Sequence, residues 1–397
     1  MKRIKIEQFA IILNLLIVAL LGVIMRYKIV YEFPFLHQKN LQHAHSHFAF
    51  VAWISQCIFY LLKNMLNQRV HSNQKKLNTL MYLNIFFSYV MLFSFIWNGY
   101  WWLSILSSSV CTLISIFFSF IYYRELQYEI KINNNKALQL ASPWINAAWL
   151  FNIISTLGTL TLSYLRMNSI FDQNLQLSAI YFYLHFQYNG FFAFMMIAIF
   201  IERYHSQISE TKKLYRVFIL MVITTLLNYG LSILWLDIHT LLYILFIISS
   251  ILYFYAWISF SSVLNTIKIT EKSIRIFYKI IWITILIKII LQTTSVIPFM
   301  SHLAYSLRSV VIAYLHLALL VITTSFLLFQ FLEKSFNKIP IIFYIIFSLI
   351  IINEVVLGIH GLTGVMGIYY PNIHIILLIV SIAIAFSFIL LIKKNFN

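Results

Sequence analysis

Long apolar runs dominate this sequence and constrain its fold more than any other feature. A helix of about 20 residues crosses the hydrocarbon core of a bilayer and satisfies its own backbone hydrogen bonds there. Twelve stretches fit that length, near 8–26, 43–64, 79–97, 101–122, 144–165, 178–201, 215–236, 240–260, 277–297, 306–330, 340–358 and 373–392. We therefore predict an all-α, polytopic membrane helix bundle with about twelve transmembrane helices.

The composition excludes most other classes of protein. Of 397 residues, 61% are hydrophobic and 10% are charged, and the mean hydropathy is +0.87. A soluble domain carries about 25% charged residues, so this chain cannot cover a water-facing surface. A soluble enzyme, a disordered protein and a nucleic-acid binder are excluded, despite the net charge of +17. No linker separates the stretches, so we expect one transmembrane domain over residues 1–397, with Cys57 and Cys111 as buried thiols.

The positions of the basic residues predict the orientation. With the N-terminus in the cytoplasm, 22 of the 28 Lys and Arg residues fall in cytoplasmic segments and five in outer segments, while Lys288 lies within a stretch. An excess of Lys and Arg marks cytoplasmic loops. We therefore predict that both termini are cytoplasmic and that the chain passes many times through a bacterial plasma membrane, with the lipid bilayer as its main partner.

The histidines gather toward the outer side of the predicted bundle. His185 and His316 lie inside the sixth and tenth stretches, roughly 12 Å and 15 Å from their outer ends at 1.5 Å per residue. Polar residues at that depth are costly and usually functional, and imidazole suits iron, copper and zinc. An outer-end histidine is more often an interfacial polar residue. The outer-end positions are His37, His43, His45, His47, His239, His302, His360 and His374, whereas His71 and His205 are cytoplasmic.

The densest group of candidate ligands opens the second stretch as His43-Ala-His45-Ser-His47. On a helix, His43 and His47 are four residues apart and share one face, and His45 points elsewhere. Ligands from several helices that project into a bundle core are how such bundles hold metals and cofactors. The sequence leaves open which of the three histidines is the ligand.

A few further features lie within or near the stretches. Lys288 is an isolated charge that either extends toward the membrane surface or takes part in proton relay or haem-propionate binding. Glu354 lies near the outer end of the eleventh stretch and has no second acid beside it. The glycine-rich segment 358–367 predicts a close-packed or re-entrant turn. The aromatic residues 100–102 are typical of an interfacial belt.

Two short segments carry a resemblance to a known family. Ala313-Tyr314-Leu315-His316 and His185-Phe-Gln-Tyr-Asn-Gly190-Phe-Phe are similar to the helix-ten and helix-six motifs of the haem-copper oxidase superfamily main subunit. The C-type oxygen reductases and nitric oxide reductases are the most similar branch. The resemblance implies twelve helices, a haem b held by His316 and one histidine of the second stretch, and copper or a second iron at His185.

The resemblance also implies a range of functions. His239 and His360 would join His185 as metal ligands, and Lys288, Tyr314 or Glu354 would serve as a proton relay or a propionate contact. The activity implied is electron transfer in respiration or the handling of oxygen or nitric oxide, with an electron donor or partner subunit and with a reductase-like oxidoreductase activity as one form.

The sequence departs from the family at the oxygen-reducing centre. The position of the high-spin haem ligand is occupied by Tyr314, and the paired copper histidines of helix seven are absent. That centre is therefore either rebuilt from other histidines or lost. Two alternatives stay open: a secondary transporter with an outer histidine cluster, and a non-catalytic haem sensor or assembly protein.

Overall fold

A computed structural model describes residues 6–66, 73–336, 339–368 and 370–396. Within these ranges every regular element is a helix, which confirms the all-α prediction. Cys57 and Cys111 are buried and free, also as predicted. Five of the 22 Lys and Arg residues counted as cytoplasmic lie outside the described ranges, namely Lys2, Arg3, Lys5, Arg69 and Lys338, and so does His71.

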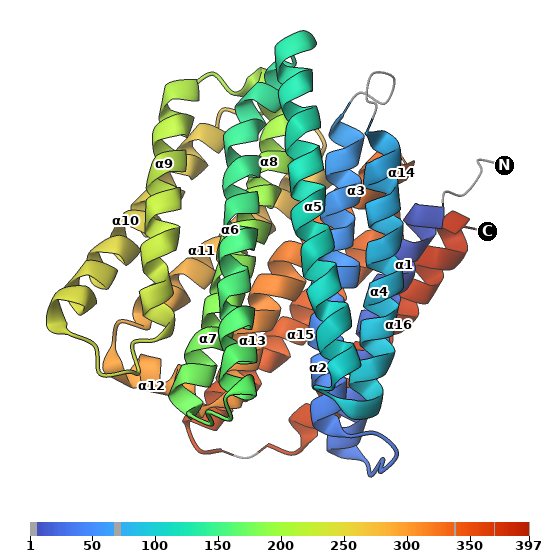
Figure 1. Cartoon of the computed structure of the whole chain (residues 1–397), viewed down its shortest axis with the longest axis vertical. Coiled ribbons are helices and arrows are strands. Elements are labelled where there is room, and N and C mark those ends of the chain that lie inside the picture. Colours follow the sequence, from blue (N-terminus) through green and yellow to red (C-terminus); the bar gives the residue numbers. More distant parts are fainter. Residues whose placement is uncertain (1–5, 67–72, 337–338, 369, 397) are drawn as a thin grey trace. The chain divides into compact units, whose positions relative to one another are not determined.

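Eleven helical segments in the described part of the chain are long and apolar enough to cross a membrane (Figure 1). Three of them combine three or four elements each: α2 (Gln38–Phe48), η1 (Ala49–Ser55) and α3 (Gln56–Met65); α7 (Gln173–His185), η2 (Phe186–Phe192), α8 (Ala193–Tyr204) and η3 (His205–Gln207); and α13 (Arg308–His316), η5 (Leu317–Thr324) and α14 (Ser325–Phe336). The others are α1 (Ile6–Val30), α4 (Gln74–Asn98), α5 (Trp102–Ile132), α6 (Lys136–Met167), α9 (Thr211–Leu227) with η4 (Asn228–Ser232), α10 (Thr240–Leu264), α15 (Ile341–Val365) and α16 (Asn372–Phe396).

The one predicted stretch not among these eleven spans is the ninth, 277–297, and most of it is helical. It forms most of α11 (Lys272–Thr294), which a short helix, α12 (Pro298–Ser306), follows before α13. Four cations lie on α11, at Lys272, Arg275, Lys279 and Lys288, and α11 is not one of the eleven candidate spans. The structure thus supports eleven spans by length and composition, and the crossing of α11 stays a prediction.

Large apolar side chains cover the outside of several helices. Ile251 on α10 is 57% exposed, and Val355 on α15 and Phe386 on α16 are each 56% exposed. Soluble proteins rarely expose contiguous apolar surface on this scale, whereas lipid tails are a suitable environment for it. The fold is that of a multi-span membrane helix bundle.

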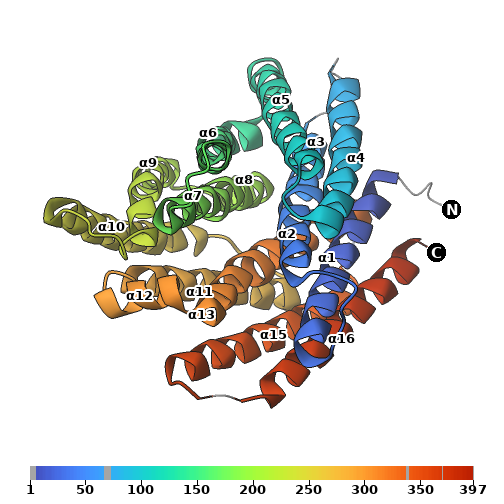
Figure 2. The same ribbon diagram turned by 60° about the horizontal axis from the view of Figure 1, so that its bottom comes forward.

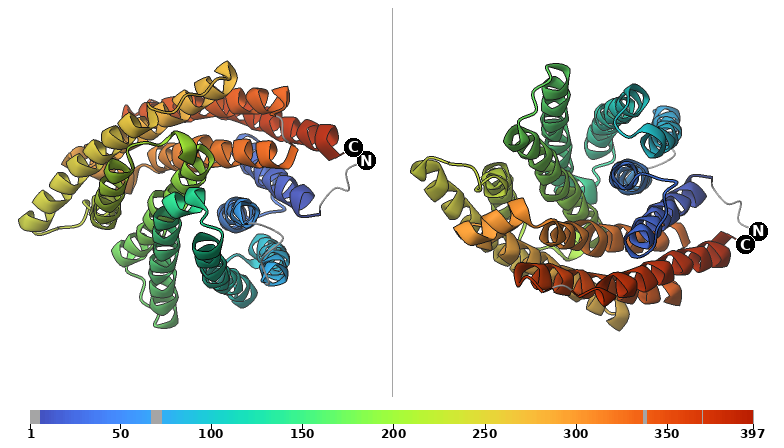
Figure 3. Two further views of the ribbon diagram at one scale, coloured as in Figure 1. Left: turned by 90° about the horizontal axis from the view of Figure 1, so that it is seen from above. Right: turned by 90° about the horizontal axis from the view of Figure 1, so that it is seen from below.

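The chain divides into two compact units. The terminal unit comprises Met1–Tyr128 and Thr324–Asn397, and the middle unit comprises Glu129–Thr323. In the terminal unit α1 lies beside α16 and α15 lies beside α16, as the blue and red ribbons of Figures 2 and 3 show. In the middle unit α6 packs against α7 and α8, and α9 packs against α10.

Three π-helical segments, η1, η2 and η5, interrupt the second, sixth and tenth predicted spans. Each begins within two residues of a histidine, namely His47, His185 and His316. Single-turn π segments inside α-helices occur frequently at functional sites. The histidine and the π segment therefore recur together every four spans, a repeat that sequence inspection did not recognise.

Buried amides complete the hydrogen bonding of η1. The Asn14 side chain on α1 donates to the carbonyl oxygen of Ala52 at 2.7 Å, and the Asn84 side chain on α4 donates to that of Val51 at 3.2 Å. Lipid offers no hydrogen bond to a backbone carbonyl that leaves the α-helical pattern. These two polar residues inside the membrane therefore stabilise the irregular backbone of the second span.

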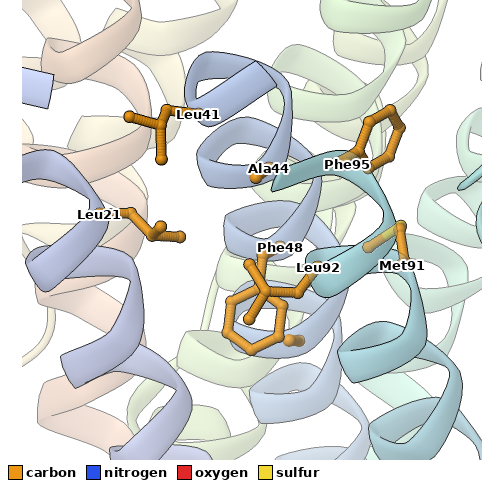
Figure 4. Close-up of a cluster of buried hydrophobic side chains, with 8 residues drawn as sticks. Leu21, Leu41, Ala44, Phe48, Met91, Leu92 and Phe95 are labelled. Carbon is orange, nitrogen blue, oxygen red and sulfur yellow. The ribbon is translucent and has the colours of Figure 1, made fainter. Parts of the chain in front are cut away.

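A hydrophobic cluster holds the outer half of the second span in place. Side chains of α2 and η1 pack between α1 and α4 (Figure 4). Its buried members are Leu21, Leu41, Ala44, Phe48, Ala52, Met91, Leu92 and Phe95. These buried residues occupy one side of α2 and prevent the helix from rotating about its axis. Each histidine of α2 therefore faces a defined neighbouring helix.

The glycine-rich segment does not form the predicted re-entrant turn. Helix α15 continues through Gly358, Gly361 and Gly364 to Val365, and the chain turns only at Gly367, where φ is +68°. A glycine inside a helix costs about 1 kcal/mol relative to alanine, which packing readily overrides. Gly361 is buried, but a Cβ atom at Gly358 would meet no atom within 4 Å, so the close-packed turn that the sequence suggested is not observed either.

Gly190 is one of the glycines that close packing requires. A Cβ atom at Gly190 in η2 would lie 2.5 Å from Cβ and 2.6 Å from Cγ of Phe151 on α6. We expect Gly190→Ala to lower the free energy of unfolding by about 1–3 kcal/mol, because added atoms in a tight contact force the neighbours apart. Thermal unfolding of the purified protein in detergent measures this.

Gly358→Ala is the matched control, since a Cβ there meets no atom within 4 Å. An equal melting temperature for Gly190→Ala and the parent protein contradicts the tight contact between α6 and η2.

Candidate functional site

Two of the three histidines in the second span face the aromatic residues of α4 and the following turn. The ring of His47 stacks on Phe95 with centroids 4.7 Å apart, and its Nε2 lies 2.9 Å from the Tyr100 hydroxyl. The His43 ring contacts Tyr100 edge-on at 4.6 Å. The predicted shared face of His43 and His47 is thus confirmed. Tyr100, expected only in an interfacial belt, belongs to this cluster.

His45 faces the opposite way, toward α1. Its Nδ1 lies 3.1 Å from the carbonyl oxygen of Val18, and its Cε1 would lie 3.7 Å from a Cβ atom built on Gly22. A carbonyl oxygen only accepts, so Nδ1 carries the proton and Nε2 carries the lone pair. Histidines that ligate metals have this arrangement, with the distal nitrogen held by a carbonyl or a carboxylate. His45 therefore has the ring arrangement of a ligand histidine, whereas His47 directs its Nε2 at the Tyr100 hydroxyl; which of the three is a ligand stays a prediction.

His316 has the same ring arrangement in the middle unit. Its Nδ1 lies 2.8 Å from the carbonyl oxygen of Ile312, one turn earlier on α13. His45 is seven residues from the start of α2 at Gln38, and His316 is eight residues from the start of α13 at Arg308. At 1.5 Å per residue each is about 10–12 Å from the first residue of its own helix.

A further group lies in the terminal unit, at the C-terminal ends of α1 and α15 and the N-terminal end of α16. The rings of His360 and His374 are in edge contact, with centroids 5.0 Å apart. The Arg26 guanidinium interacts electrostatically with both rings and with His45. The buried Nδ1 of His374 and Oε2 of Glu354 have no hydrogen-bond partner among the described residues. Sequence analysis counted His374 only among the outer-end histidines and did not single out Arg26, which lies far from His360 in the chain.

The group formed by Arg26, His360 and His374 favours an anion over a cation. Within the described ranges no three or more His, Cys, Asp or Glu side chains are placed to hold a metal ion together. A guanidinium binds carboxylate and phosphate groups through charge-assisted hydrogen bonds. Two imidazoles beside Arg26 add further donors, so the group suits a carboxylate. A metal at His360 stays a prediction.

His185 is fully buried in the middle unit, and both of its ring nitrogens are hydrogen-bonded. Its Nε2 donates to the carbonyl oxygen of Thr225 at 2.8 Å, and its Nδ1 accepts from the side-chain amide of Asn189 at 3.0 Å. A metal ion at His185 would have to displace one of these bonds. The predicted copper role of His185 is therefore not supported by its hydrogen bonding and stays a prediction.

Lys288 lies on the other side of Asn189 and is 6% exposed. Its ammonium donates to Asn189 Oδ1 and, at 3.1 Å, to Gln292 Oε1. The Tyr314 hydroxyl approaches the same Gln292 oxygen at 3.4 Å. An isolated lysine at the centre of a membrane helix costs about 2.5–3.5 kcal/mol, which these amide oxygens offset in part. Lys288 does not extend to the membrane surface, and its other predicted roles stay predictions.

The order of donors and acceptors in this network is determined by Lys288. Because the ammonium only donates, Asn189 must turn its Oδ1 toward Lys288 and its NH₂ toward His185. His185 then accepts at Nδ1 and donates from Nε2. Asn189 follows His185 by four residues and Gln292 follows Lys288 by four, so helical spacing alone could have identified both partners.

A small cavity of about 40 Å³ adjoins Lys288 in the middle unit. It is lined by Tyr188, Tyr253 and Thr323 and by apolar groups that include Trp257 and Trp282. A water molecule needs roughly 10–15 Å³ of such space, whereas cofactor pockets measure about 300–1,000 Å³. This cavity has room for a few waters or one small ion, and it is too small for a haem.

His239 serves as the N-cap of α10. Its Nδ1 accepts from the backbone N–H of Leu241 at 3.3 Å, and the residue is exposed. Capping is a sufficient structural reason for a histidine at this position. A metal at His239 stays a prediction.

No protein-family model and no curated protein matches this chain. The resemblance to haem-copper oxidases therefore rests on the residues quoted above.

The network generates a prediction about stability. Replacing Asn189 by Leu removes the hydrogen-bond donor to His185 Nδ1 and one of the two amide acceptors of the Lys288 ammonium. Unsatisfied buried groups cost about 1–3 kcal/mol each, and more when charged, so we expect Asn189→Leu to destabilise the protein by at least about 2 kcal/mol. Unfolding in detergent, followed by circular dichroism, measures this loss.

Asn174→Leu on the exposed start of α7 is the control and should change stability little. If the two variants are equally stable, the buried network does not contribute as described.

Proposed function

We propose that this chain is a haem-binding, multi-span membrane protein that transfers electrons, in which His45 and His316 would hold a b-type haem. The observation that carries the proposal is the shared arrangement of these two residues. Each ring is held through Nδ1 by a main-chain carbonyl, and each precedes a π-helical segment in its span. Both therefore present Nε2 as the nitrogen with a lone pair.

The donor sets in the terminal unit fit this group. Arg26, His360 and His374 lie at the outer ends of their helices, where they suit the carboxylates of the haem propionates. When bound, a bis-histidine haem supplies one-electron redox chemistry. The side chains named here hold the ligand nitrogens in one tautomer and provide positive charge for the propionates.

The proposal does not extend to reduction of oxygen or nitric oxide. Tyr314 occupies the position that the resemblance assigns to a second haem ligand, and both nitrogens of His185 are hydrogen-bonded. These features support a protein that carries electrons, with a respiratory donor or partner subunit. They give no support to a copper-containing reaction centre.

Membrane orientation is part of the proposal. We propose that α11 is the twelfth span and that both termini face the cytoplasm of a bacterium whose plasma membrane holds the protein. The excess of Lys and Arg in the predicted inner segments supports this orientation.

The haem proposal is tested by a dithionite-reduced minus oxidised spectrum and by iron analysis of the purified protein. We expect b-type bands with stoichiometric iron. His45→Ala and His316→Ala should each abolish the bands or shift them to those of a high-spin haem, because each removes one axial ligand. His43→Ala, two residues from His45, is the matched control and should retain them.

Three results would contradict this assignment. A colourless, iron-free protein from haem-replete cells excludes haem binding. Unchanged bands in His316→Ala exclude that ligand. Loss of the bands in His43→Ala with retention in His45→Ala transfers the ligand role to the aromatic-facing side of the second span.

Orientation is tested separately with reporter fusions. A fluorescent protein at the C-terminus should fold in the cytoplasm and fluoresce. Alkaline phosphatase fused after Asn168, between α6 and α7, should be active, and the same enzyme fused after Glu210, between α8 and α9, should be inactive. The reverse pattern at these two sites excludes a cytoplasmic N-terminus.

A further inference from the structure

The cavity beside Lys288 points to a second binding site, separate from the residues proposed for haem. We propose that it binds a single small monovalent anion, chloride under physiological conditions, with the Lys288 ammonium as its counter-charge. All residues of this site belong to the middle unit.

The groups around Lys288 favour the charged form of its side chain. Both of its hydrogen-bond partners, Asn189 and Gln292, present carbonyl oxygens, and its Nζ lies 5.2 Å from the centre of the Tyr188 ring. Two acceptors and the face of an aromatic ring all favour the ammonium form. The side chain is therefore held in surroundings built for a positive charge.

The described residues supply no negative charge to balance the Lys288 ammonium. No carboxylate of the described residues forms an ion pair with Lys288. Amide oxygens solvate an ammonium but do not neutralise it, and buried charges in proteins are normally paired. A charge of the opposite sign beside Lys288 would remove this imbalance.

Lys288 also has a free N–H donor and an adjoining cavity in which an anion could bind. The ammonium has three N–H donors, and the two amide oxygens accept two of them, which leaves one donor for a ligand. The adjoining cavity of about 40 Å³ is lined by Tyr188, Tyr253 and Thr323 among otherwise mainly apolar residues, and the Thr323 hydroxyl donates to the carbonyl oxygen of Ala318. A site with one cation, a few polar residues and apolar walls suits a weakly hydrated monatomic anion. The volume excludes sulfate with its hydration shell and larger organic anions.

The experiment compares thermal unfolding of the purified full-length protein in sodium chloride, sodium bromide and sodium gluconate at constant ionic strength. We expect chloride and bromide to raise the melting temperature saturably relative to gluconate, because a ligand that binds only the folded state stabilises it. Lys288→Met should weaken the apparent affinity for chloride at least tenfold. Lys279→Met, on the same helix but exposed, should leave it unchanged.

A second variant keeps the test decisive if Lys288→Met folds poorly. Ala318 is buried on the cavity wall, so Ala318→Val fills part of the space and leaves Lys288 in place. We expect Ala318→Val to lose the chloride effect as well. The same melting temperature in chloride and gluconate for the parent protein, or an undiminished chloride effect in Lys288→Met or Ala318→Val, overturns the proposal and leaves only water in the cavity. Since the readout is halide-dependent unfolding, its outcome does not depend on haem binding.

Discussion

The structure depends on one constraint, namely that every backbone N–H and C=O within the hydrocarbon core must find a partner inside the protein. Regular α-helices meet this constraint along most of the chain. The π-helical segments η1, η2 and η5 do not follow the α-helical pattern, and buried side chains supply the missing partners, as Asn14 and Asn84 do for η1. Polar residues in these spans thus stabilise irregular backbone, and that backbone directs the neighbouring histidines.

The histidines illustrate how one residue type takes different roles according to its second hydrogen bond. At His45 and His316 a main-chain carbonyl holds Nδ1 and leaves Nε2 as the nitrogen that carries the lone pair. At His185 the Thr225 carbonyl takes the Nε2 proton, and Asn189 occupies Nδ1. His239 caps a helix. A count of histidines on the outer side of the bundle cannot separate these cases, although their chemistry as ligands differs completely.

Some parts of the site were open to prediction from the sequence and others were not. The shared face of His43 and His47 followed from their spacing of four residues, and the same spacing could have linked Asn189 to His185 and Gln292 to Lys288. The contact between His360 and His374 joins two helices, and the interaction of Arg26 with both rings joins a third. No local spacing predicts such contacts. The prediction of a re-entrant turn at residues 358–367 was wrong. Helix α15 continues to Val365 despite the low helix propensity of its glycines, and the chain turns only at Gly367.

The sequence by itself determined that the chain is a multi-span, all-α membrane protein, and it placed every predicted stretch on a helix. The physical reason is that a lipid environment selects long apolar helices from composition and length alone. Only the tertiary structure decided which way each histidine points, that Lys288 ends on two amides instead of at the membrane surface, and that a cavity of about 40 Å³ lies beside it. These properties depend on hydrogen bonds and packing between helices, and neither leaves a periodic signal in the chain.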